Sequence, residues 1–370
     1  MTDYRDLGVK PIINAAGTYT KYGGSLVSEE VMKTMRKASR NYVDIDNLLK
    51  KSGDYIADLL GVEAALVTSG AAAGLVLASA ACMAGDNREQ IELLPSTEEM
   101  ENEIIVMRCH RNPYDQAIRT AGARFVEIGN AIENHPWQLE SAINEKTAAI
   151  VYFVQSAMFR ASLSLAQIIK IGKKYNIPVI VDAAAELPPK DNLTRFYNMG
   201  ADIVLFSGGK DIRGPQSSGL MVGRKDLIKK CLLHSYPHHG IGRPMKLDKE
   251  TIMGLVRAIE LYLEEDENLR LEKWKKMTEE ITQKLNTCKE INAFIDYPDQ
   301  PLTQPAVIPR VYVKLNSKSQ INEGEVAEEL LKGDPSVVVV VDNDYLIINP
   351  HMLAENQVET VVERIKDIVH

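Results

Sequence analysis

Apolar runs of strand length alternate with longer amphipathic segments through residues 64 to 222. The runs that we predict as strands are 64–68, 103–108, 124–128, 147–154, 177–182, 203–206 and 220–222, and the predicted helices are 28–39, 47–60, 71–84, 113–121, 137–144 and 164–175. The runs 147–154 and 177–182 are apolar almost throughout, as expected of strands buried on both faces. Strands and helices that alternate at this spacing predict a mainly parallel sheet wound with helices, the α/β class.

The pattern changes after residue 246. A long helix is predicted from Asp248 to about Cys288, where apolar positions recur at helical spacing among many Glu and Lys residues. Beyond it we predict a smaller α+β domain, with a strand at 310–315, a helix at 324–331, a hairpin of 337–341 and 345–348, and a helix at 356–368.

These patterns divide the chain into an N-terminal arm at 1–45, a large domain at 46–245, and a linking helix with a small C-terminal domain at 246–370. The arm is too short to bury its own apolar residues. We therefore expect it to lie across a neighbour, such as a second subunit.

Composition and charge narrow the classes of function. The chain has 370 residues, of which 45% are hydrophobic and 25% charged, and its formal net charge is -8. An acidic chain offers no general basic surface for nucleic acid. The four cysteines are scattered without a C-x-x-C pair, which indicates neither a disulfide framework nor a cysteine zinc site. No signal peptide or membrane-spanning run is evident, so we expect a cytoplasmic protein with no membrane partner.

Polar residues gather where the predicted strands end. Gly70, His110, Gln155, Asp182 and Lys210 each stand at or just beyond the C-terminal end of a strand. Ligands of wound parallel sheets bind outside these ends. The coincidence at five strand ends is stronger evidence for a site than any one of these residues.

Lys210 follows an apolar strand, Ser207 and two glycines. The glycines allow a tight turn close to a ligand, and desolvation favours the neutral, nucleophilic amine. This chemistry suits an imine with a carbonyl compound. A Walker phosphate loop does not fit, because Asp211 follows the lysine and no glycine stands at Gly-x4 spacing before Gly209. On these residues alone, an ordinary surface lysine in a hairpin remains the alternative.

The residues at three other strand ends allow two interpretations each. At Ser69-Gly70 a strand runs into a helix of small residues, which predicts either an anion site at the free N–H groups or a tightly packed turn. Asp182 either caps the turn that follows it or is a carboxylate in a low-dielectric pocket that keeps a partner nitrogen protonated. His110 is either a structural histidine or a ring that covers a flat ligand.

The segment 234–246 carries three histidines and two other basic residues, Arg243 and Lys246. His234, His238 and His239 have no nearby carboxylate to complete a ligand set, so we expect no metal site. Arg243 and Lys246 are expected to contact an anion, with a solvated loop as the alternative.

Five segments combine these features: Thr68-Ser-Gly-Ala-Ala, Arg108-Cys-His-Arg-Asn-Pro-Tyr-Asp-Gln-Ala-Ile-Arg-Thr-Ala-Gly-Ala, Val181-Asp-Ala-Ala-Ala, Ser207-Gly-Gly-Lys and Gly214-Pro-Gln-Ser-Ser-Gly. Together they resemble the fold type I pyridoxal-phosphate enzymes, and within them the group similar to bacterial selenocysteine synthase. The resemblance covers residues 10–260. Its most specific part is the combination of the last two segments, which begin at Ser207 and Gly214. It implies the aspartate aminotransferase-like fold, pyridoxal 5'-phosphate bound by the large domain, and a homodimer or higher homo-oligomer.

The resemblance implies a role for each matching residue. Lys210 would carry the cofactor as a Schiff base and remove the α-proton, and Asp182 would pair with the pyridine nitrogen, which makes the ring an electron sink. The other implied contacts are Ser69, Gly70, Ala71 and Ser207 with the cofactor phosphate, His110 stacked on the ring, and Gln155 near the ring hydroxyl.

The resemblance also implies a reaction, namely an ammonia-lyase acting on a phosphorylated amino-sugar acid. Selenium or sulfur transfer to an aminoacyl substrate is the alternative. Selenocysteine synthases carry an N-terminal tRNA-binding domain, whereas this chain starts with the arm, and its acidic charge argues against a tRNA partner.

The candidate contacts for the substrate are all basic. Arg213, Arg243 and Lys246 are the candidates for its distal phosphate. The run Val337–Val341 offers no arginine where many relatives hold a carboxylate, so Arg310 is the candidate for that role.

Overall fold

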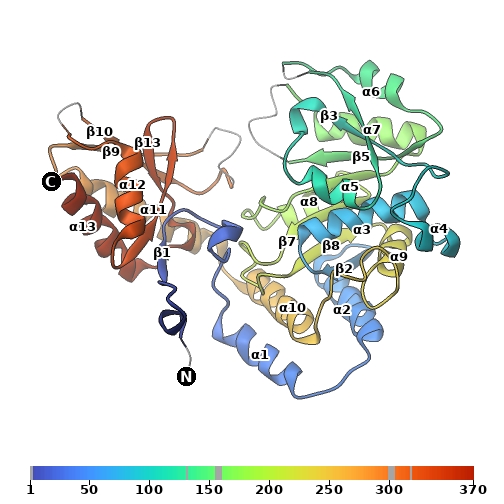
Figure 1. Ribbon diagram of the computed structural model, residues 1–370, viewed down its shortest axis with the longest axis horizontal. Helices are drawn as coiled ribbons and strands as arrows, with labels where there is room; N and C mark the ends of the chain where they lie inside the picture. The colour runs from blue at the N-terminus through green and yellow to red at the C-terminus, as the bar shows by residue number, and fades with distance from the viewer. Residues whose placement is uncertain (1–2, 131, 155–160, 299–304, 317–318) are drawn as a thin grey trace. The chain divides into compact units, whose positions relative to one another are not determined.

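The computed structural model describes residues 3–130, 132–154, 161–298, 305–316 and 319–370 (Figure 1). Its chain forms two compact units. Of the described residues, the larger unit holds those within 27–265, and the smaller unit holds 3–26, 266–298, 305–316 and 319–370. No helix among the described residues is long and apolar enough to cross a membrane.

A seven-stranded sheet forms the centre of the larger unit. Its strand order is β2 (Ala64–Thr68), β8 (Gly219–Gly223), β7 (Ile203–Ser207), β6 (Val179–Asp182), β5 (Thr147–Phe153), β3 (Glu103–Met107) and β4 (Arg124–Ile128). The strands from β7 to β4 pair in parallel, and β8 is antiparallel to both of its neighbours. The mainly parallel sheet predicted from the sequence is therefore confirmed.

Helices cover this sheet. They are α1 (Glu29–Ser39), α2 (Ile45–Leu60), α3 (Ala71–Ala84), α4 (Arg88–Leu93), α5 (Asp115–Thr120), α6 (Pro136–Ala142), α7 (Leu165–Tyr175), α8 (Asn192–Asn198), α9 (Lys225–His234) and α10 (Lys249–Glu264). Every residue of β5 is buried, as its continuous apolar run predicts. Short 3-10 turns lie at Tyr4–Leu7, Thr20–Tyr22, Arg108–His110, Pro350–Met352 and Glu355–Gln357.

Helix α3 lies across the sheet between α5 and α9 (Figure 1). Its small side chains let it approach the strands closely. A Cβ added at Gly74 would stand only 2.8 Å from Leu205 Cδ2 on β7. The helix can therefore come this close to the strand only because residue 74 is a glycine. The close packing fixes the N-terminus of α3 at the carboxyl edge of the sheet.

The long helix predicted for 248–288 is wrong, because the chain forms two helices there. α10 ends at Glu264, and α11 (Glu267–Leu285) begins after Asp266. The Asp266 side chain accepts hydrogen bonds from the amides of Asn268 and Leu269, so it is the N-cap of a new helix. The acidic run around Asp266 is also typical of a solvated helix face, so the sequence does not distinguish the cap from a surface charge.

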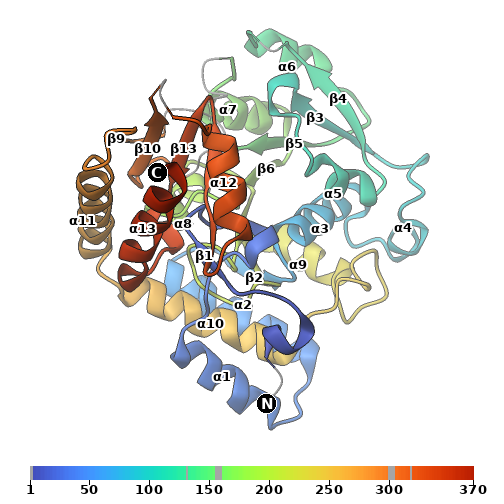
Figure 2. The same ribbon diagram turned by 60° about the vertical axis from the view of Figure 1, so that its left-hand side comes forward.

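The smaller unit has a four-stranded antiparallel sheet in the order β12 (Val340–Asp342), β13 (Tyr345–Ile348), β10 (Arg310–Leu315) and β9 (Ile291–Asp296). Helix α11 contacts β9 and β10, α12 (Glu323–Lys332) contacts β12 and β13, and α13 (Val358–Val369) packs between α11 and α12 (Figure 2). The predicted α+β domain is confirmed, although β9 was not anticipated.

Residues of the expected arm have partners in their own chain. In the smaller unit, β1 (Ile12–Asn14) pairs in parallel with β11 (Ser336–Val338). In the larger unit, α1 packs on α10, and Ser28 caps α1 by accepting a hydrogen bond from the Val31 amide.

Candidate active site

Asp182 and Lys210 come from neighbouring parallel strands. Asp182 is the last residue of β6 and pairs with Leu205 of β7, and β7 ends at Ser207, three residues before Lys210. Because parallel strands end at the same edge of a sheet, both residues stand at its carboxyl edge.

The two side chains interact electrostatically. Asp182 is 8% exposed, and its burial raises the pKa of the carboxyl, while the Ala184 amide at 2.9 Å and the Lys210 charge oppose that rise. Burial also lowers the pKa of Lys210, against the charges of Asp182 and Glu186. The amine is therefore biased toward its neutral, nucleophilic form beside a buried carboxyl group.

The two glycines before Lys210 are needed for packing within the protein. A Cβ at Gly208 would lie 2.2 Å from Ser218 Oγ, and one at Gly209 would lie 2.7 Å from the Cα of Gln216. The Gly208 amide also donates to the Ser218 carbonyl at 2.9 Å. The second Gly/Ser-rich turn thus packs directly on the lysine loop and holds it.

A helix N-terminus opens at the same edge. Gly70 has φ +125°, and a Cβ there would meet nothing within 4 Å, so the backbone borders open space. Among the described residues no side chain caps α3, while Thr68 Oγ1 donates to the Gly70 carbonyl at 2.9 Å. The free N–H groups at Ala71 and beyond suit an anion.

Ser207 belongs to the same neighbourhood as this helix N-terminus. Gly219 pairs with Ser207 on one side and Thr68 on the other. A Cβ on Gly219 would come within 2.5 Å of the Gly70 carbonyl carbon and 2.9 Å of the Ala71 nitrogen. The structure therefore brings together the residues that the sequence proposed for a phosphate: Ser69, Gly70, Ala71 and Ser207.

His110 is 1% exposed, at the end of β3. The Phe153 amide donates to its Nδ1 at 3.3 Å, which leaves the proton of the neutral ring on Nε2. Its ring meets Tyr152 edge to face, with centroids 4.7 Å apart, and burial lowers the pKa of the imidazole to about 4. His110 is thus neutral near pH 7 and tied to β5.

The remaining sequence candidates fall in several places. Gln155 lies outside the described residues. Arg213 has φ +58°, donates its amide to the Lys210 carbonyl at 2.9 Å and stands 4.0 Å from Glu265 as an ion pair. Arg213 therefore stands on the same loop as the lysine.

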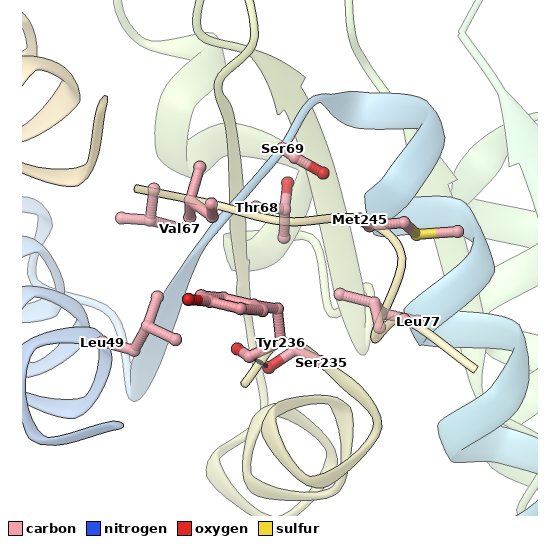
Figure 3. A pocket seen from close by; sticks show the side chains of 10 residues that line it. Leu49, Val67, Thr68, Ser69, Leu77, Ser235, Tyr236 and Met245 are labelled. Atoms are coloured by element: carbon pink, nitrogen blue, oxygen red, sulfur yellow. Dashed lines mark hydrogen bonds between the residues drawn. The ribbon is translucent and has the colours of Figure 1, made fainter. Parts of the chain in front are cut away.

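A small pocket links Ser69 to the loop of Arg243 and Lys246 (Figure 3). Its lining comes from β2, α2, α3 and the segment 235–247: Leu49, Val67, Thr68, Ser69, Leu77, Ser235, Tyr236, Gly242, Met245 and Leu247. The Arg243 guanidinium lies 5.0 Å from the centroid of the Tyr236 ring. Both basic side chains are exposed.

Arg310 is buried in the smaller unit at 1% exposure. Its guanidinium donates to the carbonyls of Ile308 at 2.5 Å and Pro305 at 3.3 Å, and burial lowers its pKa to about 10. These contacts give Arg310 a structural role in its own unit, while its role toward a substrate stays a prediction.

Two histidines of the 234–246 loop have protein partners. His234 Nε2 lies 2.9 Å from the Gly85 carbonyl, and His238 Nε2 lies 3.0 Å from Asp46 Oδ1. The described residues do contain one group that could hold a metal ion, in the smaller unit, where ligand atoms of Cys288, Glu290 and His370 lie within 4.8 Å of one another. Sequence reasoning missed it, because 82 positions separate residues 288 and 370.

Sequence reasoning also missed two carboxylates beside the lysine. Glu186 interacts electrostatically with Lys210, and Asp211 accepts a hydrogen bond from Tyr262 of α10 at 2.8 Å. Asp211 is 1% exposed. Glu186 lies close in the sequence to Asp182, and Asp211 follows Lys210. Residues at these two positions could equally well belong to a turn or a hairpin with no part in the site, so their position alone did not identify them.

The donor set suits a phosphorylated aromatic aldehyde. A buried amine, a buried carboxyl group one strand away and an uncapped helix N-terminus with open backbone meet at one sheet edge. Those are the groups needed to bind an aldehyde covalently, to charge a ring nitrogen and to hold a phosphate.

Comparison with known proteins places the chain among enzymes of this kind. The family model SelA, described as L-seryl-tRNA selenium transferase, matches residues 12–367. The chain is 33% identical to D-glucosaminate-6-phosphate ammonia lyase of Salmonella typhimurium, over 99% of this chain and 97% of that protein. It is 32% identical to a 5'-C-glycyluridine monooxygenase-decarboxylase of a Streptomyces species, over 99% of this chain and 92% of that protein.

Comparison with solved structures supports the same family and fold. The structure of D-glucosaminate-6-phosphate ammonia-lyase superimposes with a TM-score of 0.87 at 32% identity, covering 100% of this chain and 99% of that chain. Serine palmitoyltransferase of S. paucimobilis, solved with a bound PLP adduct, has a TM-score of 0.59 at 12% identity, covering 96% of this chain and 87% of that chain, and shows the shared fold alone.

Proposed function

We propose an ammonia-lyase activity for this chain, which belongs to the L-seryl-tRNA selenium transferase (SelA) family of fold type I pyridoxal-phosphate enzymes. In the proposed reaction D-glucosaminate 6-phosphate gives 2-keto-3-deoxy-6-phosphogluconate and ammonia. The observation that carries the proposal is the electrostatic pairing of Lys210 and Asp182 at the carboxyl edge of the sheet. Likeness to the Salmonella enzyme over nearly the whole of both chains supports the choice of reaction.

Pyridoxal phosphate would be held by residues of the larger unit. Lys210 Nζ would bind its aldehyde, and the free amides at Gly70 and Ala71, with Ser69 and Ser207, would receive its phosphate. Asp182 would keep the pyridine nitrogen protonated, and the neutral His110 ring would stand beside the pyridine ring. Gln155 would contact its hydroxyl. When bound, the cofactor supplies an electron sink for the pair left at the substrate α-carbon.

Lys210 has a second task in this proposal. Once the substrate amine replaces it, the freed amine removes the α-proton, a role that its lowered pKa favours. The electron pair forms the Cα–Cβ double bond, and the β-hydroxyl leaves with the Cβ–O pair and a proton. Return of Lys210 to the aldehyde would set the enamine free. The enamine takes up a proton at Cβ and exchanges its nitrogen, as ammonia, for the oxygen of water, so one water leaves, one enters, and no oxidant is needed.

Basic side chains would select a substrate with two anionic ends. Arg213 stands on the lysine loop, and Arg243 and Lys246 stand beside the pocket that Ser69 lines. We assign the distal phosphate to these three residues. The substrate carboxylate is assigned to Arg310, which must then give up part of its bonding to the Ile308 and Pro305 carbonyls.

The test is a direct assay of keto acid from D-glucosaminate 6-phosphate with the cofactor-loaded protein. Lys210→Ala is the matched negative control, and Lys229→Ala on α9 controls for loss of a lysine elsewhere in the unit. Product from wild type and Lys229→Ala, and none from Lys210→Ala, is the expected result. No product above the Lys210→Ala level would reject the reaction.

A transferase or another reaction of the family is the second candidate, because a relative with a different activity is almost equally similar. It would use the same lysine and carboxylate with another acceptor. Keto acid and ammonia in equal amounts favour the lyase. Conversely, aminoacyl-tRNA or nucleoside-linked glycine that is consumed while the amino-sugar acid is untouched would establish the second candidate.

A further inference from the structure

Three side chains of the kinds that bind metal ions meet at one place in the smaller unit. A ligand atom from each of Cys288, Glu290 and His370 lies within 4.8 Å of the other two. All three residues belong to the smaller unit, and none is a candidate contact for the cofactor or the substrate. The group therefore has no part in the reaction proposed above.

Two separate segments carry these side chains. Cys288 lies just past the end of α11, where its amide donates to the Leu285 carbonyl at 3.0 Å, and Glu290 immediately precedes β9. His370 follows α13, and its amide donates to the Lys366 carbonyl at 3.0 Å. Helices α11 and α13 pack on each other. The fold itself therefore brings the three side chains together.

A hydrogen bond already joins two members of the group. Cys288 Sγ donates to Glu290 Oε2 at 3.1 Å. The thiol proton thus stands between two potential ligand atoms, and a metal ion that takes its place can bind both. Cys288 is 4% exposed, Glu290 is half-buried and His370 is exposed. The exposed side at His370 gives an ion access from solvent.

Charges around the group act in both directions. Helices α11 and α13 both end beside it, and the free carbonyl groups of a helix C-terminus favour a cation. The ammonium groups of Lys289 and Lys366 act on the same side chains and oppose a cation. Lys366 Nζ also donates to Thr287 Oγ1 at 2.8 Å. Anionic ligands are needed to outweigh the two lysines, and the group offers a thiolate and a carboxylate.

The donor set selects the kind of metal. A thiolate and an imidazole suit Zn²⁺ and similar transition-metal ions, whereas Mg²⁺ and Ca²⁺ prefer oxygen ligands alone. The negative charges of one thiolate and one carboxylate balance those of a divalent ion. Three protein ligands leave the fourth position of a tetrahedral zinc site to water.

We propose that Cys288, Glu290 and His370 form a zinc site that fastens the end of α13 to the turn after α11. On binding, the Cys288 thiol gives its proton to solvent as the Zn–S bond forms, and Glu290 and His370 each supply an electron pair. Nothing is oxidised or reduced. Burial raises the pKa of the thiol, so near pH 7 its proton is still bound before the ion arrives.

The decisive experiment titrates the cofactor-loaded full chain, without a histidine tag or chelator, with Zn²⁺ and with Co²⁺. Calorimetry in buffers of different ionisation enthalpy gives the affinity, the stoichiometry and the number of protons released. Co²⁺ reports a thiolate ligand by its charge-transfer absorption. The variants are Cys288→Ser and His370→Gln. Cys82→Ser and His135→Gln are the matched controls, because they make the same changes in the larger unit.

Wild type should bind one Zn²⁺ per chain, release about one proton per ion and gain thermal stability, because an ion that binds only the native protein stabilises it. His370→Gln should weaken Zn²⁺ binding at least about 10-fold, since loss even of an outer partner of a ligand costs that much. At saturating Co²⁺ this variant should keep the thiolate absorption, whereas Cys288→Ser should lose it. Both controls should match wild type.

Three results would overturn the zinc site. Wild type could bind no Zn²⁺, His370→Gln could bind it as tightly as wild type, or a control could weaken binding as much as His370→Gln, which would place the ion in the larger unit. His370 is exposed, so its substitution leaves the core intact and decides the matter even if Cys288→Ser does not fold. Keto acid formation does not enter these measurements, so the zinc site and the lyase function stand or fall separately.

Discussion

The Phe153 amide donates a hydrogen bond to His110 Nδ1 across the ends of β5 and β3, and this bond fixes the neutral ring. The pKa of His110 is about 4 in the native protein, against an ordinary value of 6.5. Between these values the unfolded chain binds a proton that the native protein does not bind. Native stability should therefore be complete above pH 6.5 and fall as the pH drops toward 4.

His110→Gln tests this linkage, because glutamine can accept the same amide hydrogen but does not titrate. From pH 6.5 to pH 4, wild type should lose about 3 kcal/mol more unfolding free energy than the variant. Urea unfolding at a series of pH values measures both curves. The exposed His135→Gln should keep the wild-type curve. Parallel curves for wild type and His110→Gln would contradict a neutral, buried His110.

Tyr262→Phe should destabilise the protein by about 1.5–3 kcal/mol, because it removes a buried hydrogen bond to a carboxylate. Tyr55→Phe is a close control, since Tyr55 donates to Glu260 of the same helix α10 at 2.7 Å but is exposed. Its loss should be far smaller. Equal midpoints in chemical unfolding for both variants would show that Asp211 does not depend on Tyr262.

Gly219→Ala should disturb the helix N-terminus at Gly70. The added Cβ would stand 2.5 Å from the Gly70 carbonyl carbon and 2.6 Å from Thr68 Oγ1, too close for a strand that cannot move. We expect a loss of about 1–3 kcal/mol in unfolding free energy. If the amides near Gly70 bind the cofactor phosphate, cofactor affinity should fall more than this loss of stability explains, whereas normal affinity in a folded variant would argue against that contact.

Sequence pattern predicted the parallel sheet well, because its strands are buried runs separated by helices of ordinary length. The strand ends then followed from the fold, so Asp182 and Lys210 could be placed at one edge before any coordinates. Helix boundaries inside charged segments could not be predicted, since Asp266 as a cap and as a surface charge look alike in the sequence.

The candidate site was predictable only where backbone position decides it. Ser69, Gly70 and Ser207 meet because β8 lies between β2 and β7, an order that the structure gives, whereas the sequence grouped them only through the family resemblance. The hydrogen bond from Tyr262 to Asp211 joins segments that are distant in the sequence and depends on side-chain direction, so it leaves no periodic signal. The structure adds a second reason for Gly208 that the sequence did not suggest: its missing side chain makes room for Ser218.

Arg213 adopts φ +58°, a left-handed conformation that costs a residue with a side chain about 1 kcal/mol or more. A non-glycine residue held there beside Lys210 points to a use for the side chain.

Arg213→Gly should relax the backbone. The unfolding free energy should therefore change by less than about 1 kcal/mol, because relief of strain offsets the added entropy of the unfolded chain. If the guanidinium binds the distal phosphate, KM should rise about 10–100-fold with kcat nearly unchanged. Asn176→Gly, at φ 56° after α7, makes the same backbone change and should leave KM unaltered. A KM for Arg213→Gly equal to that of Asn176→Gly would assign the phosphate to Arg243 and Lys246 instead.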